Sequence, residues 1–358
     1  MMMIRTDDGY SLVECLIAMA LTLMVTGSGL ALANRSTIMG QGQPDALDMQ
    51  ERLRIAHQVL FSALMRAGAG MSVSPAEGPL NWSMAPIIPR RIGAQNPDPD
   101  LSARTDAITV TFVPETVAQS VTDSALSVAS GLAVRVQPNC PVGQTACGFQ
   151  AGMTALVFDR SAHFDLFSIP RVSGATAELR PHGAGSGYAY AAGAAATEVE
   201  SHTYYFDRAA KQLRQYDGDQ TDVPVADNVS GVSFEYFGDP YPPLNPRPPA
   251  GVENCLYDAA GNLIPMPVLA GAVDGLAPLP LSMFTDGPWC GGGTTRFDAD
   301  LLRIRLVRVT LRVQATAATM RAAAPDVATP GISRESARDL RDLVTTFVVS
   351  PRNLMRGR

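Results

Sequence analysis

The sequence predicts an α+β protein in which a long N-terminal hydrophobic helix packs on a mainly antiparallel β-sheet head domain with long loops. Two patterns predict this fold class. Near the N-terminus an uncharged apolar stretch is followed by an amphipathic repeat, which is the pattern of a long helix. From about residue 104, short segments rich in β-branched and aromatic residues alternate with turn residues, which favours antiparallel hairpins over strand-helix-strand units. With 46% hydrophobic residues, the 358-residue chain has ample material for a core.

The apolar stretch runs from about Leu12 to Ala33, and no charged residue lies between Cys15 and Asn34. At ~1.5 Å per residue it is long enough to cross a hydrocarbon core of ~30 Å. It is too long for the core of a secretory signal peptide, and an acidic residue, Glu14, lies at its beginning. A carboxylate there is costly in lipid and needs a partner. We therefore expect a transmembrane or assembly helix over residues 10–34.

An amphipathic continuation of this helix is expected over residues 35–70, ending near Gly68 to Gly70. Whether the helix is continuous or broken near Pro44 stays open, because proline can kink a helix or begin a new one. His57 lies off the apolar face and is interpreted as a solvated residue. The apolar face itself consists of residues spaced by three and four, namely Ala46, Met49, Leu53, Ala56, Leu60, Ala63 and Ala67.

The head domain, residues 71–358, is expected to be rich in strands and to lie beyond the membrane. One face of its sheet must be covered, and the helix over residues 45–67 is the expected cover. The predicted strands are 107–112, 155–158, 164–169, 203–206, 212–216, 229–236, 306–313 and 345–349.

A Pro/Gly-rich insertion at about 238–298 interrupts this strand pattern. An unstructured loop of that length is unusual in a compact domain, so it is either functional or cross-linked. A disulfide across it would lower the entropy of the unfolded chain, and this is our first interpretation. The alternative hypothesis is that the loop recognises another subunit.

Four cysteines in loop-like sequence, Cys140, Cys147, Cys255 and Cys290, form an even set that is consistent with two disulfides in an oxidising compartment. Three pairings are possible, and we favour Cys140 with Cys147 and Cys255 with Cys290, which are nearest neighbours in sequence. A zinc site is the competing interpretation, but the chain has no CxxC pair among them. Cys15, inside the apolar run, is interpreted as a small hydrophobic residue.

No constellation of residues predicts catalysis, a metal site or a cofactor. The net charge of −6 argues against a whole-molecule affinity for nucleic acid. The glycine run Gly183–Gly187 lacks the lysine of a phosphate loop, and the turn Asp258–Asn262 has too few carboxylates for calcium. The histidines have no metal-ligand spacing: His57, His163, His182 and His202. His163 and Asp165 would share one face of a strand, where ordinary sheet packing is the expected role.

A run of arginines marks the late strand: Arg303, Arg305, Arg308 and Arg312. We interpret it as a solvated sheet face paired with acidic residues. A patch for a partner subunit or for DNA is the alternative. Because the sequence contains no constellation of residues that predicts catalysis, we expect a protein that is not an enzyme.

The N-terminal residues resemble the type IV prepilin family. The sequence Gly9-Tyr10-Ser11-Leu12-Val13-Glu14 is similar to that family's processing motif, which precedes a long apolar helix. The resemblance implies that residues 1–9 are a leader peptide, that prepilin peptidase cuts between Gly9 and Tyr10, and that the new amine of Tyr10 is methylated. It also implies that Glu14 pairs with the N-terminal amine of a neighbouring subunit, which satisfies two opposite charges in a low dielectric.

Looser matches extend along the chain and resemble the PilW-type minor pilins: 50–56, 66–68, 105–110, 229–236, the strand ending at Val313, and 347–354. They imply a subunit in the initiation, assembly or tip of a type IV pilus. The implied partners are prepilin peptidase, other minor pilins, the major pilin and the inner-membrane assembly platform. The implied location is the bacterial inner membrane, with one span and a periplasmic head, and then the pilus.

Two other functions remain open. Pseudopilin J of type II secretion has a related layout, which would place the chain in a pseudopilus tip. A membrane-anchored periplasmic binding domain or adhesin is a different class of protein, and the sequence identifies no DNA or surface ligand.

Overall fold

The computed structural model describes residues 11–69, 85–99, 102–115, 118–122, 124–126, 131–133, 145–159, 164–181, 189–244, 247–248, 250–286, 289, 299–316, 321 and 340–354. The chain forms two compact units. The first contains Met1–Glu51 and Gln314–Asp342. The second contains Arg52–Val313 and Leu343–Arg358 and is called the β-rich unit below.

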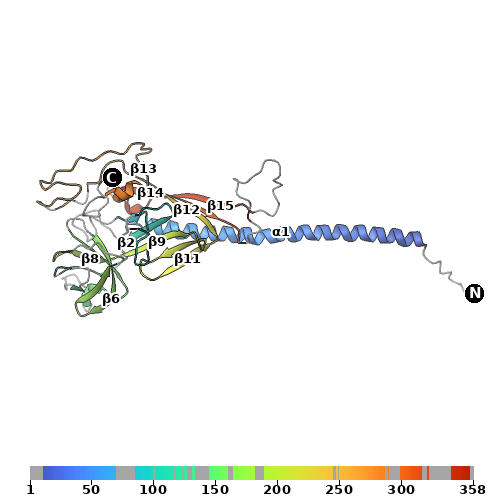
Figure 1. Cartoon of the computed structure of the whole chain (residues 1–358), viewed down its shortest axis with the longest axis horizontal. Helices are drawn as coiled ribbons and strands as arrows, with labels where there is room; N and C mark the ends of the chain where they lie inside the picture. Colours follow the sequence, from blue (N-terminus) through green and yellow to red (C-terminus); the bar gives the residue numbers. More distant parts are fainter. Residues whose placement is uncertain are drawn as a thin grey trace, which may run out of the picture. The chain divides into compact units, whose positions relative to one another are not determined.

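Helix α1 runs from Leu12 to Arg66 as one element of 55 residues, with Pro44 inside it (Figure 1). The sequence leaves open whether the helix is broken near Pro44, and the structure shows a continuous helix. The helix ends where expected, because Gly68 adopts a left-handed φ of 70°. Its N–H donates to the carbonyl oxygen of Thr111 at 3.0 Å, which ties the helix end to strand β2. Glycine is the residue that takes this capping conformation without a steric penalty.

The strands form three antiparallel sheets. The eight predicted strands are confirmed, while the expectation of a single sheet is wrong. The first sheet has the order β1 (Ile87–Ile88), β2 (Ala107–Phe112), β9 (Glu200–Asp207), β10 (Gln212–Tyr216) and β11 (Asp222–Asp227). The second has the order β13 (Ala277–Leu279), β12 (Val229–Gly238), β14 (Ile304–Val313) and β15 (Leu343–Val349). The third has the order β3 (Gln119–Val121), β8 (Ala195–Glu198), β5 (Thr154–Phe158), β6 (Phe164–Ser173), β7 (Thr176–Pro181) and β4 (Gly131–Ala133).

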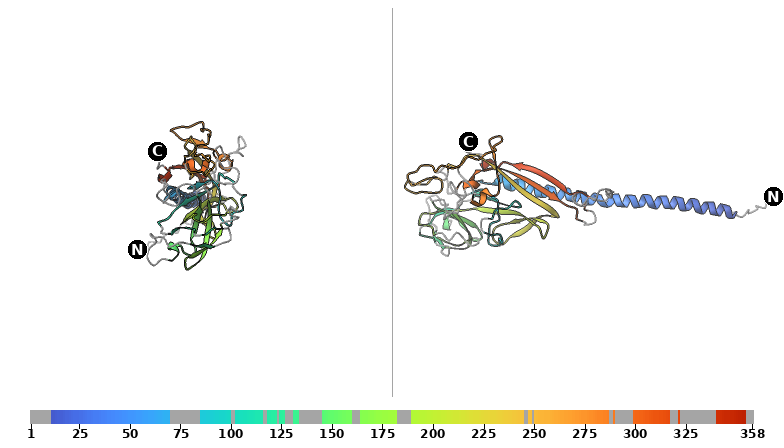
Figure 2. Two further views of the ribbon diagram at one scale, coloured as in Figure 1. Left: turned by 90° about the vertical axis from the view of Figure 1, so that its left-hand side faces the viewer. Right: turned by 45° about the horizontal axis from the view of Figure 1, so that its top comes forward.

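The main core lies between the end of α1 and the first two sheets. Figure 2 gives two further views of the ribbon with α1 and the strands. Ala56, Leu60 and Ala63 of the predicted apolar face are buried in this core, together with inward residues of the strands. Burying a side chain such as Leu60 stabilises the fold by about 1.5–3 kcal/mol. The amphipathic helix is therefore the cover that the sheets need.

His57 is only half-buried but is not simply solvated, so the sequence interpretation is corrected here. Its ring stacks on Phe61 with centroids 5.9 Å apart and meets the edge of Phe347 at 4.3 Å. The approach of strand β15 to this side of the helix is the physical reason, and only the folded structure reveals it.

The third sheet encloses a core of its own, which includes Phe149, Phe167, Leu179 and Tyr190. The insertion also has more structure than expected. It contains β13 and the short helix α2 (Met283–Asp286), and Trp289 lies fully buried with Leu256, Tyr257 and Ala299. The indole N–H of Trp289 donates to the carbonyl oxygen of Pro267 at 2.7 Å. Local packing therefore organises the described part of the insertion.

Candidate functional site

The first half of α1 is apolar and exposed on every side. Its segment Leu12–Ala31 is 20 residues long, and none of it is buried. By length and composition this segment can cross a membrane, as an anchor or as a signal sequence. A helix that is apolar all round needs an apolar environment on all sides. The large exposed side chains are Leu12, Val13, Leu16, Ile17, Met19, Leu21, Leu23, Met24, Val25 and Leu30.

The hydroxyl groups of this segment are satisfied within the helix itself. Thr22 donates to the carbonyl oxygen of Ala18 at 2.7 Å, and Thr26 donates to that of Thr22 at 2.6 Å. Ser28 donates to the carbonyl oxygen of Val25 at 2.9 Å. Because backbone and hydroxyl groups find partners inside the helix, the segment can leave water without losing hydrogen bonds.

Ser11 and Glu14 cap the first turn of α1. The N–H of Val13 donates to Ser11 Oγ at 3.2 Å, and the N–H of Ser11 donates to Glu14 Oε2 at 3.1 Å. This reciprocal pair is a capping box, and the negative charge lies at the positive end of the helix dipole. A carboxylate has room for further donors, so the cap leaves Glu14 able to accept one from another chain. Gly9 and Tyr10 lie outside the described residues.

The arginine run behaves mostly as the sequence indicates. Arg303 and Arg305 both reach Oδ2 of Asp239, at 2.9 and 3.0 Å, where β12 meets the insertion. Arg308 pairs with Glu235 at 2.8 Å across the sheet. Arg312 is exposed and has no ion-pair partner within the part of the chain that the structure describes. Three of the four arginines are thus paired with acidic residues, as interpreted.

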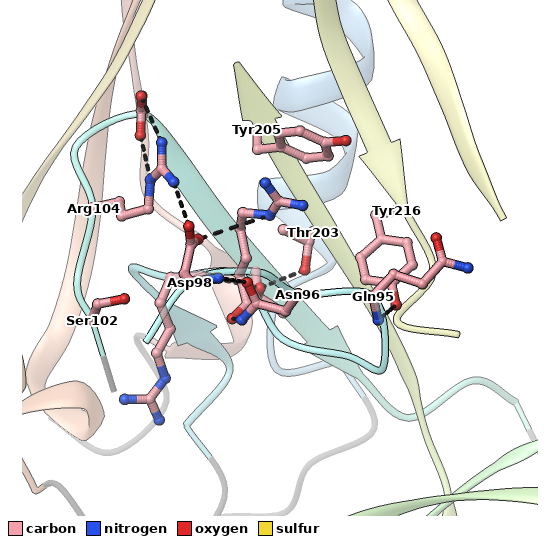
Figure 3. A network of polar contacts seen from close by, with 12 residues as sticks. Gln95, Asn96, Asp98, Ser102, Arg104, Thr203, Tyr205 and Tyr216 are labelled. Carbon is pink, nitrogen blue, oxygen red and sulfur yellow. Dashed lines mark hydrogen bonds and ion pairs between the residues drawn. The ribbon is translucent and has the colours of Figure 1, made fainter. Parts of the chain in front are cut away.

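A polar network around the loop before β2 was not predicted. Arg104 donates through Nη1 to Asp98 Oδ1 at 2.7 Å and through Nε to Asp106 Oδ1 at 2.8 Å (Figure 3). Arg208 Nη2 reaches Asp106 Oδ2 at 3.0 Å. Burial alone would raise the pKa of Asp106, but the hydrogen bonds and charges of Arg104 and Arg208 outweigh it and lower that pKa below its usual value.

The same network continues onto β9, β10 and β11. Tyr205 donates to Asp222 Oδ2 at 2.5 Å, and the guanidinium of Arg91 lies 4.0 Å from the Tyr205 ring centre. Burial and the bond to Asp222 raise the pKa of Tyr205 to about 12. Arg214 donates through Nε to Asp222 Oδ1 at 2.9 Å. These hydrogen bonds and the ring contact join the loop to three strands, so the network is suited to fixing the loop on the sheet.

A signal for part of this network was present in the sequence. Asp98, Arg104 and Asp106 alternate in charge within a short polar stretch, which is a pattern of local ion pairs. Arg208 follows strand β9 and Asp222 lies on strand β11, and no local pattern in the sequence indicates that they belong to this network.

The remaining candidate residues do not come together. Asp165 accepts a hydrogen bond from Tyr190 at 2.6 Å, whereas His163, His182 and residues 183–187 lie outside the described residues. His202 contacts Glu200 at 3.4 Å and Gln215 at 2.6 Å. Asp258 accepts the N–H of Asn262 at 2.8 Å, and this contact lowers the pKa of Asp258. Among the described residues, no group of three His, Cys, Asp or Glu could hold a metal ion.

Cys15 is free and exposed in the apolar segment. Cys147 and Cys255 each take part in a disulfide bond. Cys140 and Cys290 lie outside the described residues, so the pairing stays a prediction.

No protein-family model, curated protein or solved structure matches the chain. Its function therefore has to be inferred from its own residues and contacts.

Proposed function

We propose that this chain is a prepilin-like subunit, cut after Gly9 and methylated at Tyr10, that acts as a PilW-type minor pilin in the initiation, assembly or tip of a type IV pilus. The observation that carries the proposal is the exposed apolar segment Leu12–Ala31, which begins within the motif from Gly9 to Glu14. The same helix supplies Leu60 and its neighbours to the core of the β-rich unit. One continuous helix thus includes both a membrane-compatible segment and a part of the folded domain.

Assembly uses two properties of this helix. The apolar segment first lies in the bacterial inner membrane, and in a filament it packs against the helices of neighbouring subunits, which replace lipid. Glu14 accepts the Ser11 N–H and leaves capacity for the amine of a neighbour's Tyr10. Pairing of these opposite charges lowers the cost of holding a carboxylate in an apolar environment.

The proposed partners follow from this mechanism. They are prepilin peptidase, other minor pilins, the major pilin and the assembly platform in the inner membrane. We also propose that Cys140 pairs with Cys147 and Cys255 with Cys290, as expected for a domain that faces an oxidising periplasm.

The first experiment is the intact mass of the protein from cells with and without prepilin peptidase. The proposal predicts the loss of residues 1–9 and the gain of one methyl group only when the peptidase is present. Spectra recorded before and after reduction count the disulfides in the same sample. An N-terminus that is identical in both strains would leave a membrane-anchored β-rich domain and would refute prepilin processing.

The role of Glu14 is tested by two substitutions that separate its charge from its cap. Glu14→Ala removes both, whereas Glu14→Gln keeps a side chain that can accept the Ser11 N–H but removes the charge. We expect both variants to insert in the membrane and both to lose incorporation into sheared filaments. Normal incorporation of Glu14→Gln would show that the cap, and not charge pairing, is what assembly needs.

Incorporation into pili must also be distinguished from incorporation into a secretion pseudopilus. Strains that lack either the pilus ATPase or the secretion ATPase provide this comparison. Loss of the subunit from the cell surface only in the first strain supports the pilus, and loss only in the second supports the pseudopilus.

A further inference from the structure

The second sheet of the β-rich unit carries an exposed apolar and acidic feature at one edge. Edge strand β13 is preceded by a two-residue turn, Val273-Asp274-Gly275-Leu276, in which Val273 and Leu276 exchange backbone hydrogen bonds of 2.9 and 3.0 Å. Asp274 and Gly275 have positive φ angles of 52° and 79°, as in a type I′ turn. The turn is therefore well defined, and Val273 at its start is 71% exposed.

Two other exposed side chains belong to the insertion that contains this turn. Val268 and Tyr241 are both exposed, and the N–H of Leu269 donates to the carbonyl oxygen of Pro240 at 2.8 Å, which holds their two segments together. We call Val273 and Asp274 the β13 patch. Residues 239–286 contain five acidic residues and a single base, Arg247, and Asp239 among the five is paired with Arg303 and Arg305.

The opposite edge of the same sheet has the complementary chemistry. On the outer face of β15, Val344 is 51% exposed and Val348 is 48% exposed. The strand register places Val344 beside Arg312 of β14, whose other neighbour is Gly231 of β12. Because Gly231 has no side chain, this row contains no acidic residue to pair with Arg312. We call Arg312, Val344 and Val348 the β15 patch.

We propose that a second copy of this chain docks its β13 patch on the β15 patch of the first. Val273 packs against Val344 and Val348, and Asp274 pairs with Arg312. Charge complementarity identifies the occupant, since an exposed valine with an acidic neighbour meets exposed valines beside an arginine without a partner among the described residues. The β15 patch lies on paired strands, and the turn that carries Val273 and Asp274 is closed by two backbone hydrogen bonds, so little backbone ordering opposes the contact.

The symmetry of this contact has a structural consequence. The two patches lie at different edges of one sheet, so the contact is heterologous and each copy keeps one patch unoccupied. Copies can therefore add in a row, each joined to the next by the same contact. This association needs neither leader cleavage nor methylation, so its failure would leave the proposed function untouched.

The test is sedimentation velocity of the full-length chain in detergent micelles over a range of protein concentrations. We expect self-association that Asp274→Arg and Arg312→Asp each weaken by about tenfold or more, because each places like charges in contact. An equimolar mixture of the two variants restores association, since each contact then joins opposite charges. Val273→Ser weakens association in the same way. Arg180→Asp and Val223→Ser, which alter exposed residues of other sheets, leave it unchanged.

Three results would overturn the proposal. One is a chain that stays monomeric at all concentrations. Another is association that persists in both charge variants, which would assign it to the apolar helices. The third comes from a photo-crosslinker placed at position 273 in cells: crosslinks to residues 340–354 of a differently tagged copy support the contact, whereas crosslinks only to another protein identify a different occupant and refute it.

Discussion

Asp106→Asn should destabilise the β-rich unit by removing the charge at the centre of its polar network. The Asp106 side chain is only 6% exposed and accepts hydrogen bonds from Arg104 at 2.8 and 3.1 Å and from Arg208 at 3.0 Å. Removing one partner from a buried ion pair typically costs about 3–5 kcal/mol. Here Arg208 is 75% exposed and can return to water, so we expect a loss of about 2–3 kcal/mol in the free energy of unfolding.

Urea unfolding of the full-length chain in micelles, followed by near-ultraviolet circular dichroism, measures this loss. Glu235→Gln is the matched control, because Glu235 forms an exposed ion pair with Arg308 and should lose about 1 kcal/mol or less. A variant of Asp106 that unfolds within about 0.5 kcal/mol of the wild type would refute the reasoning, since even an exposed pair can contribute that much.

The pH dependence of the same loss gives a second check. The pKa of Asp106 is lowered from its ordinary value of 3.8 in the folded protein. Its stabilising contribution is therefore fully present above pH 3.8 and is lost as the pH falls through the lower, folded pKa. The deficit of Asp106→Asn should be constant near neutral pH and should shrink in the acid range. A deficit that stayed constant in acid would assign the effect to packing and not to charge.

Two further substitutions test particular contacts in the second sheet. Tyr236→Phe should raise the free energy of unfolding by about 1 kcal/mol, because the buried Tyr236 hydroxyl has no hydrogen-bond partner among the described residues and an unsatisfied group is costly. Thermal unfolding measures this change, and a variant less stable than the wild type would contradict the prediction. Gly238→Ala should prevent normal folding, because a Cβ there would overlap the carbonyl oxygen of Arg303, whereas Gly231→Ala has its nearest neighbour at 3.9 Å and should be tolerated. Soluble yield and melting temperature compare the two glycine variants, and equal values would contradict this assignment.

The sequence predicted those elements whose pattern is local. The helix follows from spacing of three and four, and the strands 107–112, 229–236 and 306–313 follow from β-branched and aromatic residues. The missed strands have weak local signals. Two of the four residues of Ala195–Glu198 are alanine, and Asp222–Asp227 contains Pro224, yet both are strands because neighbouring strands pair with them. Tertiary pairing outweighs propensity at such positions.

At the candidate sites, contacts between residues near in sequence could likewise be predicted, and contacts between distant residues could not. The motif around Glu14 is contiguous, so its capping contact with Ser11 could be anticipated from the residue types and their spacing. The pairing of Arg208 with Asp106 joins residues 102 positions apart, and the two docking patches depend on the order of strands in a sheet. The order of strands in a sheet depends on contacts between distant segments, so the local residue pattern of each strand does not reveal it.

Helix α1 shows why one element carries two kinds of sequence. Over Leu12–Ala31 every side of the helix is apolar and exposed, so the stable environment is a uniform apolar one such as lipid or packed helices. Over 52–66 the face that carries Ala56, Leu60 and Ala63 is buried in the β-rich unit, and polar residues such as Arg54 are exposed. Lipid would leave the polar face of the second half unsatisfied, and water would expose the whole surface of the first half. Neither solvent alone suits the whole helix, which is consistent with the membrane segment that the proposed function requires.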